Sequence, residues 1–112
     1  MPGPDFSATV EETGQWTVVS VSGEIDLSTS PALRRALDQA AQKGSAVVVD
    51  LSAVTFLDST GLGDLVRARE AVISAGGQFS LVVTQPRIRR VLDITGLNEV
   101  FFIHETLAAA TT

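Results

Sequence analysis

The sequence predicts an α/β domain whose mixed sheet starts with an antiparallel hairpin and continues through strand–helix–strand crossovers. Segments with strand-like patterns alternate with segments of helical periodicity, and glycine or proline marks most of the changes between them. Because such crossovers are right-handed and return to the same sheet, the later strands are expected to be parallel. A chain of 112 residues with 45% hydrophobic side chains can bury one core. We therefore expect residues 1–112 to form a single domain, with its core at about 6–107.

The first two strands are predicted to form the hairpin. Residues 6–12 and 16–23 both alternate apolar and polar side chains, as half-buried strands do. Thr13 and Gly14 supply the turn between them. Trp16 is expected to pack on this hairpin rather than to form a binding site, because lone aromatic residues usually belong to a core.

A first helix and a buried strand are predicted next. The helix is expected to begin with Ser30 as its cap and Pro31 at its first position, and to end at Gly44. One apolar stripe runs along it, formed by Leu33, Ala36, Leu37 and Ala40. The strand at 46–51 is apolar without alternation, which is typical of a strand covered on both faces.

A second helix is predicted to start at about Thr60 and to end at Gly76 and Gly77, with a strand at 79–83 after it. Its inward side chains are expected to be Leu62, Leu65, Val66, Val72 and Ile73.

The last elements are a third helix and a short strand. Pro86 opens the helix, which carries Ile88, Val91 and Leu92, and Gly96 closes it. Residues 100–103 are expected to form the final strand before an alanine-rich tail.

Composition excludes several classes of function. The chain has no cysteine and one histidine, so disulfides, thiolate catalysis and a metal site are not expected, and no cofactor is predicted. A net charge of -5 repels phosphate backbones, which argues against direct nucleic-acid binding. Residues 1–6 lack the pattern of an export signal, and no apolar run reaches the length of a membrane span. We therefore expect a cytoplasmic protein without membrane contact.

Side chains with hydroxyl and carboxyl groups cluster where the second helix begins. Asp58, Ser59 and Thr60 follow the buried strand and a short apolar connection at 54–57. The first N–H groups of a helix lack partners and carry the positive end of its dipole, so a phosphate there would be well accommodated. These residue types are also ordinary helix caps, yet a cap requires one oxygen and three candidates stand in a row. Gly61 is expected to leave the hydroxyls open to a macromolecule.

A second polar segment is expected beside this cluster. Gly23, Glu24 and Asp26 leave the second strand, and the carboxyl ends of neighbouring parallel strands meet at one edge of a sheet. Ligand and partner sites gather at that edge. The alternative is an ordinary solvated acidic loop.

Three stretches together resemble a known family. They are Gly23, Glu24, Ile25 and Asp26; then Asp50, Leu51, Val54, Phe56, Leu57, Asp58, Ser59, Thr60, Gly61 and Leu62; then Val91, Leu92, Ile94, Gly96 and Leu97. These stretches are similar to the signatures of the bacterial anti-sigma factor antagonists, or anti-anti-sigma factors, which are stand-alone members of the STAS domain family. The resemblance extends from about residue 6 to residue 107, so it implies a single STAS-like domain.

The resemblance implies a partner switch without catalysis by this chain. In that family the unmodified antagonist binds an anti-sigma factor that is also a serine kinase, and the sigma factor is released. The kinase phosphorylates the serine after the motif aspartate, which here is Ser59, with Thr60 as the second candidate. A phosphatase of the PP2C type restores the antagonist. The partner-facing residues implied are Gly23, Glu24, Asp26, Asp58, Ser59, Thr60 and Gly61.

The same residues fit other functions less well. A response-regulator receiver would use Asp50, but Lys43 is misplaced for it, and a hydrolase would need Ser59 to meet His104 without the usual Gly-x-Ser-x-Gly setting. A STAS module of another assembly, such as a stressosome-type scaffold or a transporter-associated regulator, is the closer alternative. The arginines Arg87, Arg89 and Arg90 can either pair with an acidic partner or remain solvated.

Overall fold

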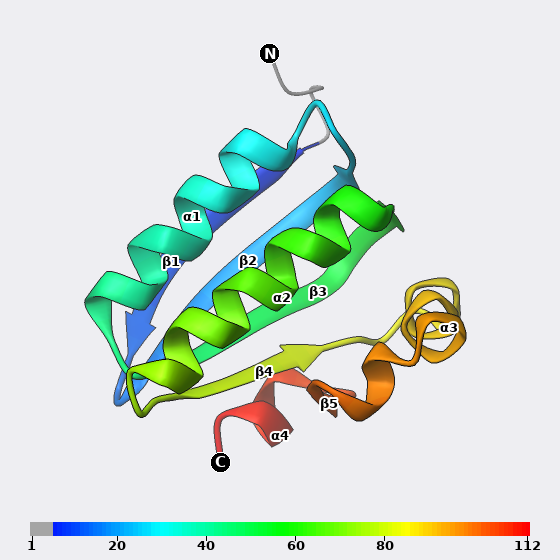
Figure 1. Ribbon diagram of the computed structural model, residues 1–112. Helices are drawn as coiled ribbons and strands as arrows, with labels where there is room; N and C mark the ends of the chain where they lie inside the picture. Colours follow the sequence, from blue (N-terminus) through cyan, green and yellow to red (C-terminus); the bar gives the residue numbers. More distant parts are fainter. Residues whose placement is uncertain (1–5) are drawn as a thin grey trace.

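The computed structural model describes residues 6–112, which form a five-stranded sheet with two long helices side by side on one face (Figure 1). Residues 1–5, including most of the stretch in which no export signal is expected, lie outside the described residues. No helix within 6–112 combines the length and the apolar character needed to cross a membrane. The elements, in chain order, are β1 (Ser7–Thr13), β2 (Trp16–Ile25), α1 (Ser30–Lys43), β3 (Ala46–Leu57), α2 (Ser59–Ser74), β4 (Gln78–Val82), α3 (Pro86–Thr95), the 3-10 helix η1 (Leu97–Glu99), β5 (Phe102–His104) and α4 (Leu107–Ala110).

The strands lie in chain order across the sheet, β1-β2-β3-β4-β5. β1 and β2 are antiparallel and turn at Gly14, whose φ is +62°, whereas every later pairing is parallel. The predicted mixed sheet, its hairpin and its parallel crossovers are therefore confirmed.

The main core fills the space between the sheet and the helices α1 and α2. The four residues predicted as the inward stripe of α1 are all buried. A smaller cluster lies on the opposite face, where Trp16 packs against Val18, Val48, Val82 and Ala110. Trp16 is thus a packing residue of the hairpin, as expected.

The inward face of α2 differs from the prediction at its end. Leu62, Leu65 and Val72 are buried and Val66 is half-buried, but Ile73 is 40% exposed. Ile73 lies in the last turn and lines an open hollow together with Phe79 and Phe102. The prediction that Ile73 faces inward is therefore wrong.

The strand ends nearest the predicted site also differ. β3 continues to Leu57, so the stretch predicted as a connection at 54–57 is strand, and β2 continues to Ile25, so the predicted loop starts only at Asp26. Two register shifts in the β2–β3 pairing, at Ser20/Ser22 and at Gly23/Glu24, let both strands stay paired to their ends. Gly23 has a φ of +91°, so its missing side chain permits the second shift.

The cap of α1 is a further correction. Thr29, not Ser30, is the cap residue, and Ser30 is the first helical residue. The Ser30 hydroxyl is turned inward and donates to Asp64 of α2, at 2.6 Å. The Ser30 side chain thus joins α1 to α2 instead of capping its own helix.

The C-terminal elements are shifted by one or two residues from the prediction. The last strand starts at Phe102 rather than at 100, because Phe101 is buried against Phe79 with ring centroids 6.1 Å apart. The alanine-rich tail forms a short helix that was not predicted. Its cap is Thr106, whose hydroxyl accepts from the N–H of Ala109 at 3.1 Å.

Candidate functional site

The candidate site lies at the edge of the sheet where β2 and β3 end and α2 begins, at the upper end of the sheet in Figure 1. We call this edge the rim; it consists of residues 24–28 and 56–60. Ser59 is exposed, whereas Asp58 and Thr60 are half-buried. The predicted phosphoacceptor thus lies on the surface, at the first residue of a helix of 16 residues.

Asp58 alone caps α2. Its side chain accepts a hydrogen bond from the N–H of Gly61, with 3.1 Å between Oδ1 and N. Within residues 6–112 neither the Ser59 nor the Thr60 hydroxyl makes a hydrogen bond to another group. The capping alternative therefore accounts for Asp58 but not for the two hydroxyls that follow it.

The start of α2 is fixed to the end of β2. The N–H of Asp58 donates to the carbonyl of Ile25 at 3.2 Å. Gly61 is buried, and a Cβ there would collide with Ile25 Cγ2 and would lie 2.7 Å from Leu57 Cδ1. The expectation that Gly61 keeps the hydroxyls open is thus replaced by a packing reason: only glycine lets the helix lie this close to the strands.

The acidic loop is held in one shape by its own hydrogen bonds. Asp26 Oδ1 accepts from the Ser28 hydroxyl at 2.7 Å, from the Ser28 N–H at 2.9 Å and from the Thr29 N–H at 3.2 Å. The bond from the Ser28 hydroxyl is the largest cause of a lowered pKa for Asp26, and the backbone bonds add to it against an opposing effect of desolvation. The Thr29 hydroxyl donates to the carbonyl of Glu24 at 2.9 Å. The carboxylate of Asp26 therefore shapes the loop, and Glu24 is the exposed acid of the rim.

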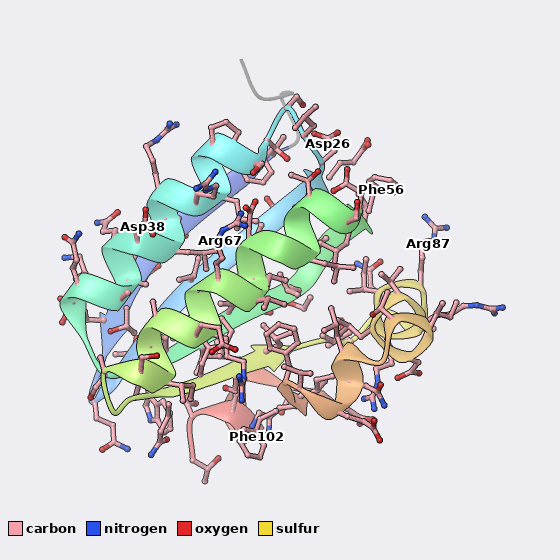
Figure 2. The ribbon with its side chains drawn as sticks, viewed as in Figure 1. Asp26, Asp38, Phe56, Arg67, Arg87 and Phe102 are labelled. Atoms are coloured by element: carbon pink, nitrogen blue, oxygen red, sulfur yellow. The ribbon has the colours of Figure 1, made fainter. Side chains whose placement is uncertain are left out.

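Two exposed apolar side chains belong to the same rim and were not predicted. Leu27 is 75% exposed in the acidic loop, and Phe56 is 45% exposed on β3, where it pairs with Glu24 of β2. Figure 2 shows Phe56 beside Asp26 at this end of the sheet. The sequence carries a weak signal for Leu27, which belongs to no apolar stripe, whereas Phe56 falls in the stretch predicted as an apolar connection, where no pattern indicates exposure.

The arginines of α3 lie beyond the end of β4. Arg87 Nη1 approaches the carbonyl of Thr55 at 3.5 Å, and Arg89 pairs with Asp93 of its own helix at 3.1 Å. Figure 2 shows Arg87 extending from α3 on the side of the molecule nearest to Phe56. Their role as a partner contact stays a prediction.

The residues of the alternative functions are not assembled. Asp50 Oδ1 accepts from the N–H of Ser52 at 3.0 Å, whereas Lys43 lies 3.8 Å from Glu12, so no receiver-like pair forms. His104 is in β5, far around the sheet from the start of α2 (Figure 1), so Ser59 has no histidine beside it.

Comparisons with known proteins agree with this architecture. The sequence model of the STAS domain matches residues 7–110. The anti-sigma-F factor antagonist RsfB of Mycobacterium tuberculosis is 38% identical over 100% of this chain and 93% of its own length. The anti-sigma-B factor antagonist of Bacillus subtilis is 38% identical over 76% of this chain and 78% of its own length.

A solved structure shows the same arrangement. The crystal structure of an anti-sigma factor antagonist from Mycobacterium paratuberculosis superposes with a TM-score of 0.89 at 40% identity, covering 99% of this chain and 96% of that one. The family match, the relatives and the solved structure all span most of the chain. The chain therefore belongs to the STAS domain family, in its group of anti-sigma factor antagonists.

Proposed function

We propose that this protein binds an anti-sigma factor that is also a serine kinase, and that phosphorylation of Ser59 by this kinase ends the binding. The names of the relatives supply the class of partner. The role of Ser59 is supported by its position: it is exposed at the N-terminus of a helix, and its hydroxyl is not needed as the cap because Asp58 caps the helix. A phosphatase of the PP2C type would restore the binding form.

The fold is expected to tolerate the phosphate. Ser59 is the first residue of α2, where unpaired N–H groups and the helix dipole favour an anion by about 0.3 to 1 kcal/mol. The group would extend into solvent from an exposed residue, so no core contact is displaced. The modification therefore acts on binding and not on stability.

An interface with the anti-sigma factor would not tolerate a phosphate on Ser59 equally well. The phosphate adds about -1.5 to -2 charges beside the Asp58 carboxylate, and Glu24 adds a further acid on the neighbouring strand. A charge that is left desolvated and unpaired costs about 2 to 5 kcal/mol. Because each 1.4 kcal/mol is about tenfold in affinity, binding would weaken roughly 30-fold to several thousand-fold.

The rim also indicates the chemistry of the partner surface. Leu27 and Phe56 offer apolar area, and Glu24 adds an exposed acid opposite Phe56 on the neighbouring strand. Apolar side chains surrounded by polar groups are typical of the energetically important centre of an interface. We expect the anti-sigma factor to present an apolar pocket with basic residues around it.

The proposal assigns the chain a regulatory role, without catalysis or a cofactor, in the cytoplasm where sigma factors act. The alternative, a STAS module built into a larger assembly, requires a large complex. Size-exclusion chromatography distinguishes the two, because the proposed antagonist elutes as a small species, alone or with one anti-sigma factor.

Mass spectrometry tests the modification directly. The protein is incubated with ATP and each candidate anti-sigma kinase from the same genome, and the phosphate is located by peptide mapping. We expect one phosphate on Ser59, none on Ser59→Ala, and normal modification of the control Thr60→Ala. Phosphate on Thr60, or no phosphate with any of these kinases, would contradict the proposal. Isothermal titration should then show binding by the wild type and by Ser59→Ala, and its loss in the phosphorylated protein.

A further inference from the structure

A carboxylate is buried between α1 and α2 that the proposed switch does not use. Asp64 lies in the second turn of α2, and its side chain has 0% exposed surface. A buried carboxylate is costly unless hydrogen bonds and cations match it. The partners of Asp64 therefore indicate what it does.

Each oxygen of Asp64 has its own partners. Oδ2 accepts from the Ser30 hydroxyl at 2.6 Å. Oδ1 accepts from Arg67 Nη2 at 2.7 Å, and Arg34 Nε lies 3.8 Å from the same oxygen. Figure 2 shows Arg67 between the two helices. The Ser30 side chain is buried too, so the bond joins two buried groups, and loss of either leaves the other unsatisfied.

This bond joins α1, which follows the loop segment of the rim, to α2, which starts in its other segment. Ser30 follows the acidic loop directly, and its N–H donates to the carbonyl of Asp26 at 2.9 Å. Asp64 follows Ser59 by five residues in α2, which corresponds to about 7.5 Å along the helix axis. In the part of the chain from 6 to 112, Asp64 makes the polar side-chain contacts between α1 and α2, through Ser30 and Arg34. Its carboxylate thus links the base of the acidic loop to the helix that carries Ser59.

We propose that Asp64 is a positioning residue that fixes the acidic loop, residues 26–29, against the phosphoacceptor helix, so that a partner meets Leu27 and Ser59 in one arrangement. A surface that is already in its bound arrangement loses less conformational freedom on binding. The effect of Asp64 on docking of the partner rests on the proposed function, whereas its effect on the position of the acidic loop does not. Without the bond, we expect the KM for phosphorylation of Ser59 to rise about tenfold, equivalent to about 1.4 kcal/mol, at nearly unchanged kcat.

Amide hydrogen exchange of the free protein tests the effect on the loop. The variants are Asp64→Asn and the milder Ser30→Ala, which removes one hydroxyl and gives a reading even where Asp64→Asn does not fold. Val72→Ala is the control for global stability, because Val72 is a buried residue of α2 in a later turn, and Asp38→Asn controls for the lost charge on an exposed residue. At matched global stability, we expect the amides of Thr29 and Ser30 to exchange about tenfold faster in Ser30→Ala than in Val72→Ala. Equal exchange would overturn the proposal.

Phosphorylation kinetics test the effect on docking, with the kinase that modifies wild-type Ser59 in the presence of ATP. A higher KM in Ser30→Ala, together with wild-type values for Val72→Ala and Asp38→Asn, supports the positioning role. An unchanged KM despite faster exchange overturns it. If no anti-sigma kinase modifies the wild type, the proposed function fails, and the exchange experiment still decides whether Asp64 fixes the loop.

Discussion

Replacing Gly61 by alanine is expected to destabilise the protein, whereas the same change two residues later, at Gly63, is expected to stabilise it. A Cβ at Gly61 would collide with Ile25 and would lie 2.7 Å from Leu57 Cδ1, and both of these side chains are buried. At Gly63 the nearest heavy atom would be Arg67 Nη1, at 4.0 Å. The two substitutions thus add the same methyl group to the same helix, once in a tightly packed position and once in open space.

The magnitudes follow from this geometry. Overpacking lowers the free energy of unfolding by about 1 to 3 kcal/mol, and alanine in place of glycine inside a helix raises it by up to about 1 kcal/mol. We expect Gly61→Ala to lose about 1 to 2 kcal/mol and Gly63→Ala to gain about 0.5 to 1 kcal/mol. For 112 residues the unfolding entropy is about 0.24 kcal/mol/K, so each kcal/mol shifts Tm by about 4 °C.

Thermal unfolding followed by circular dichroism measures both variants against the wild type. The expected Tm values differ by about 6 to 12 °C between the two variants, with the wild type between them. If Gly61→Ala proved as stable as Gly63→Ala, the close packing of α2 on Ile25 would not exist in solution, and the fixed placement of Ser59 would lose its main support.

The remaining predictions concern the rim. Ser59→Asp should weaken anti-sigma factor binding less than phosphorylation does, because it adds one charge rather than about two, and calorimetric titration with equal affinities for both would contradict this. Phe56→Ser should weaken that binding about 3- to 10-fold, because only the 45% of Phe56 that is still exposed can be newly buried, which is worth about 0.7 to 1.4 of the roughly 1.5 to 3 kcal/mol for a whole phenylalanine, and Thr55→Ser on the same strand is the control. Because the pKa of Asp26 is lowered in the folded protein, its contribution to stability is complete above the ordinary value of 3.8 and is lost as the pH falls below it. Asp26→Asn should therefore flatten the fall of Tm below about pH 4, and a slope like that of the wild type would refute the assignment.

The order and type of the main elements could be predicted because local patterns determine them. The stripe of α1, the turn at Gly14 and the closure of α3 at Gly96, whose φ is +77°, each depend on a few neighbouring residues. The ends of β2 and β3 depend instead on how two strands pair across register shifts, which no local pattern shows. The same holds for Ile73, which continues the helical periodicity of α2 but is 40% exposed in its last turn.

The residues of the candidate site also separate into those that local patterns predict and those that only the tertiary structure reveals. Ser59 could be located because a helix start follows from its cap and the apolar stripe that comes after it. Phe56 and Leu27 could not, because their exposure appears only when the two strand ends are set side by side. Asp64 gave no signal, since its partner Ser30 is 34 residues away in the sequence.

The contacts at the rim favour exclusion at the interface over a change of shape as the mechanism of the switch. The N–H of Asp58 bonds to Ile25, Gly61 packs on the same residue, and Asp64 bonds to Ser30. A phosphate added to Ser59 would extend from an exposed residue, whereas Gly61, Asp64 and Ser30 are buried, so we expect it to leave these contacts in place. A ligand shifts a conformational equilibrium only by interacting differently with its two states. Without such a difference we expect the rim to keep its shape on phosphorylation, and the free-energy cost to arise where the partner would have to cover a dianion beside Asp58.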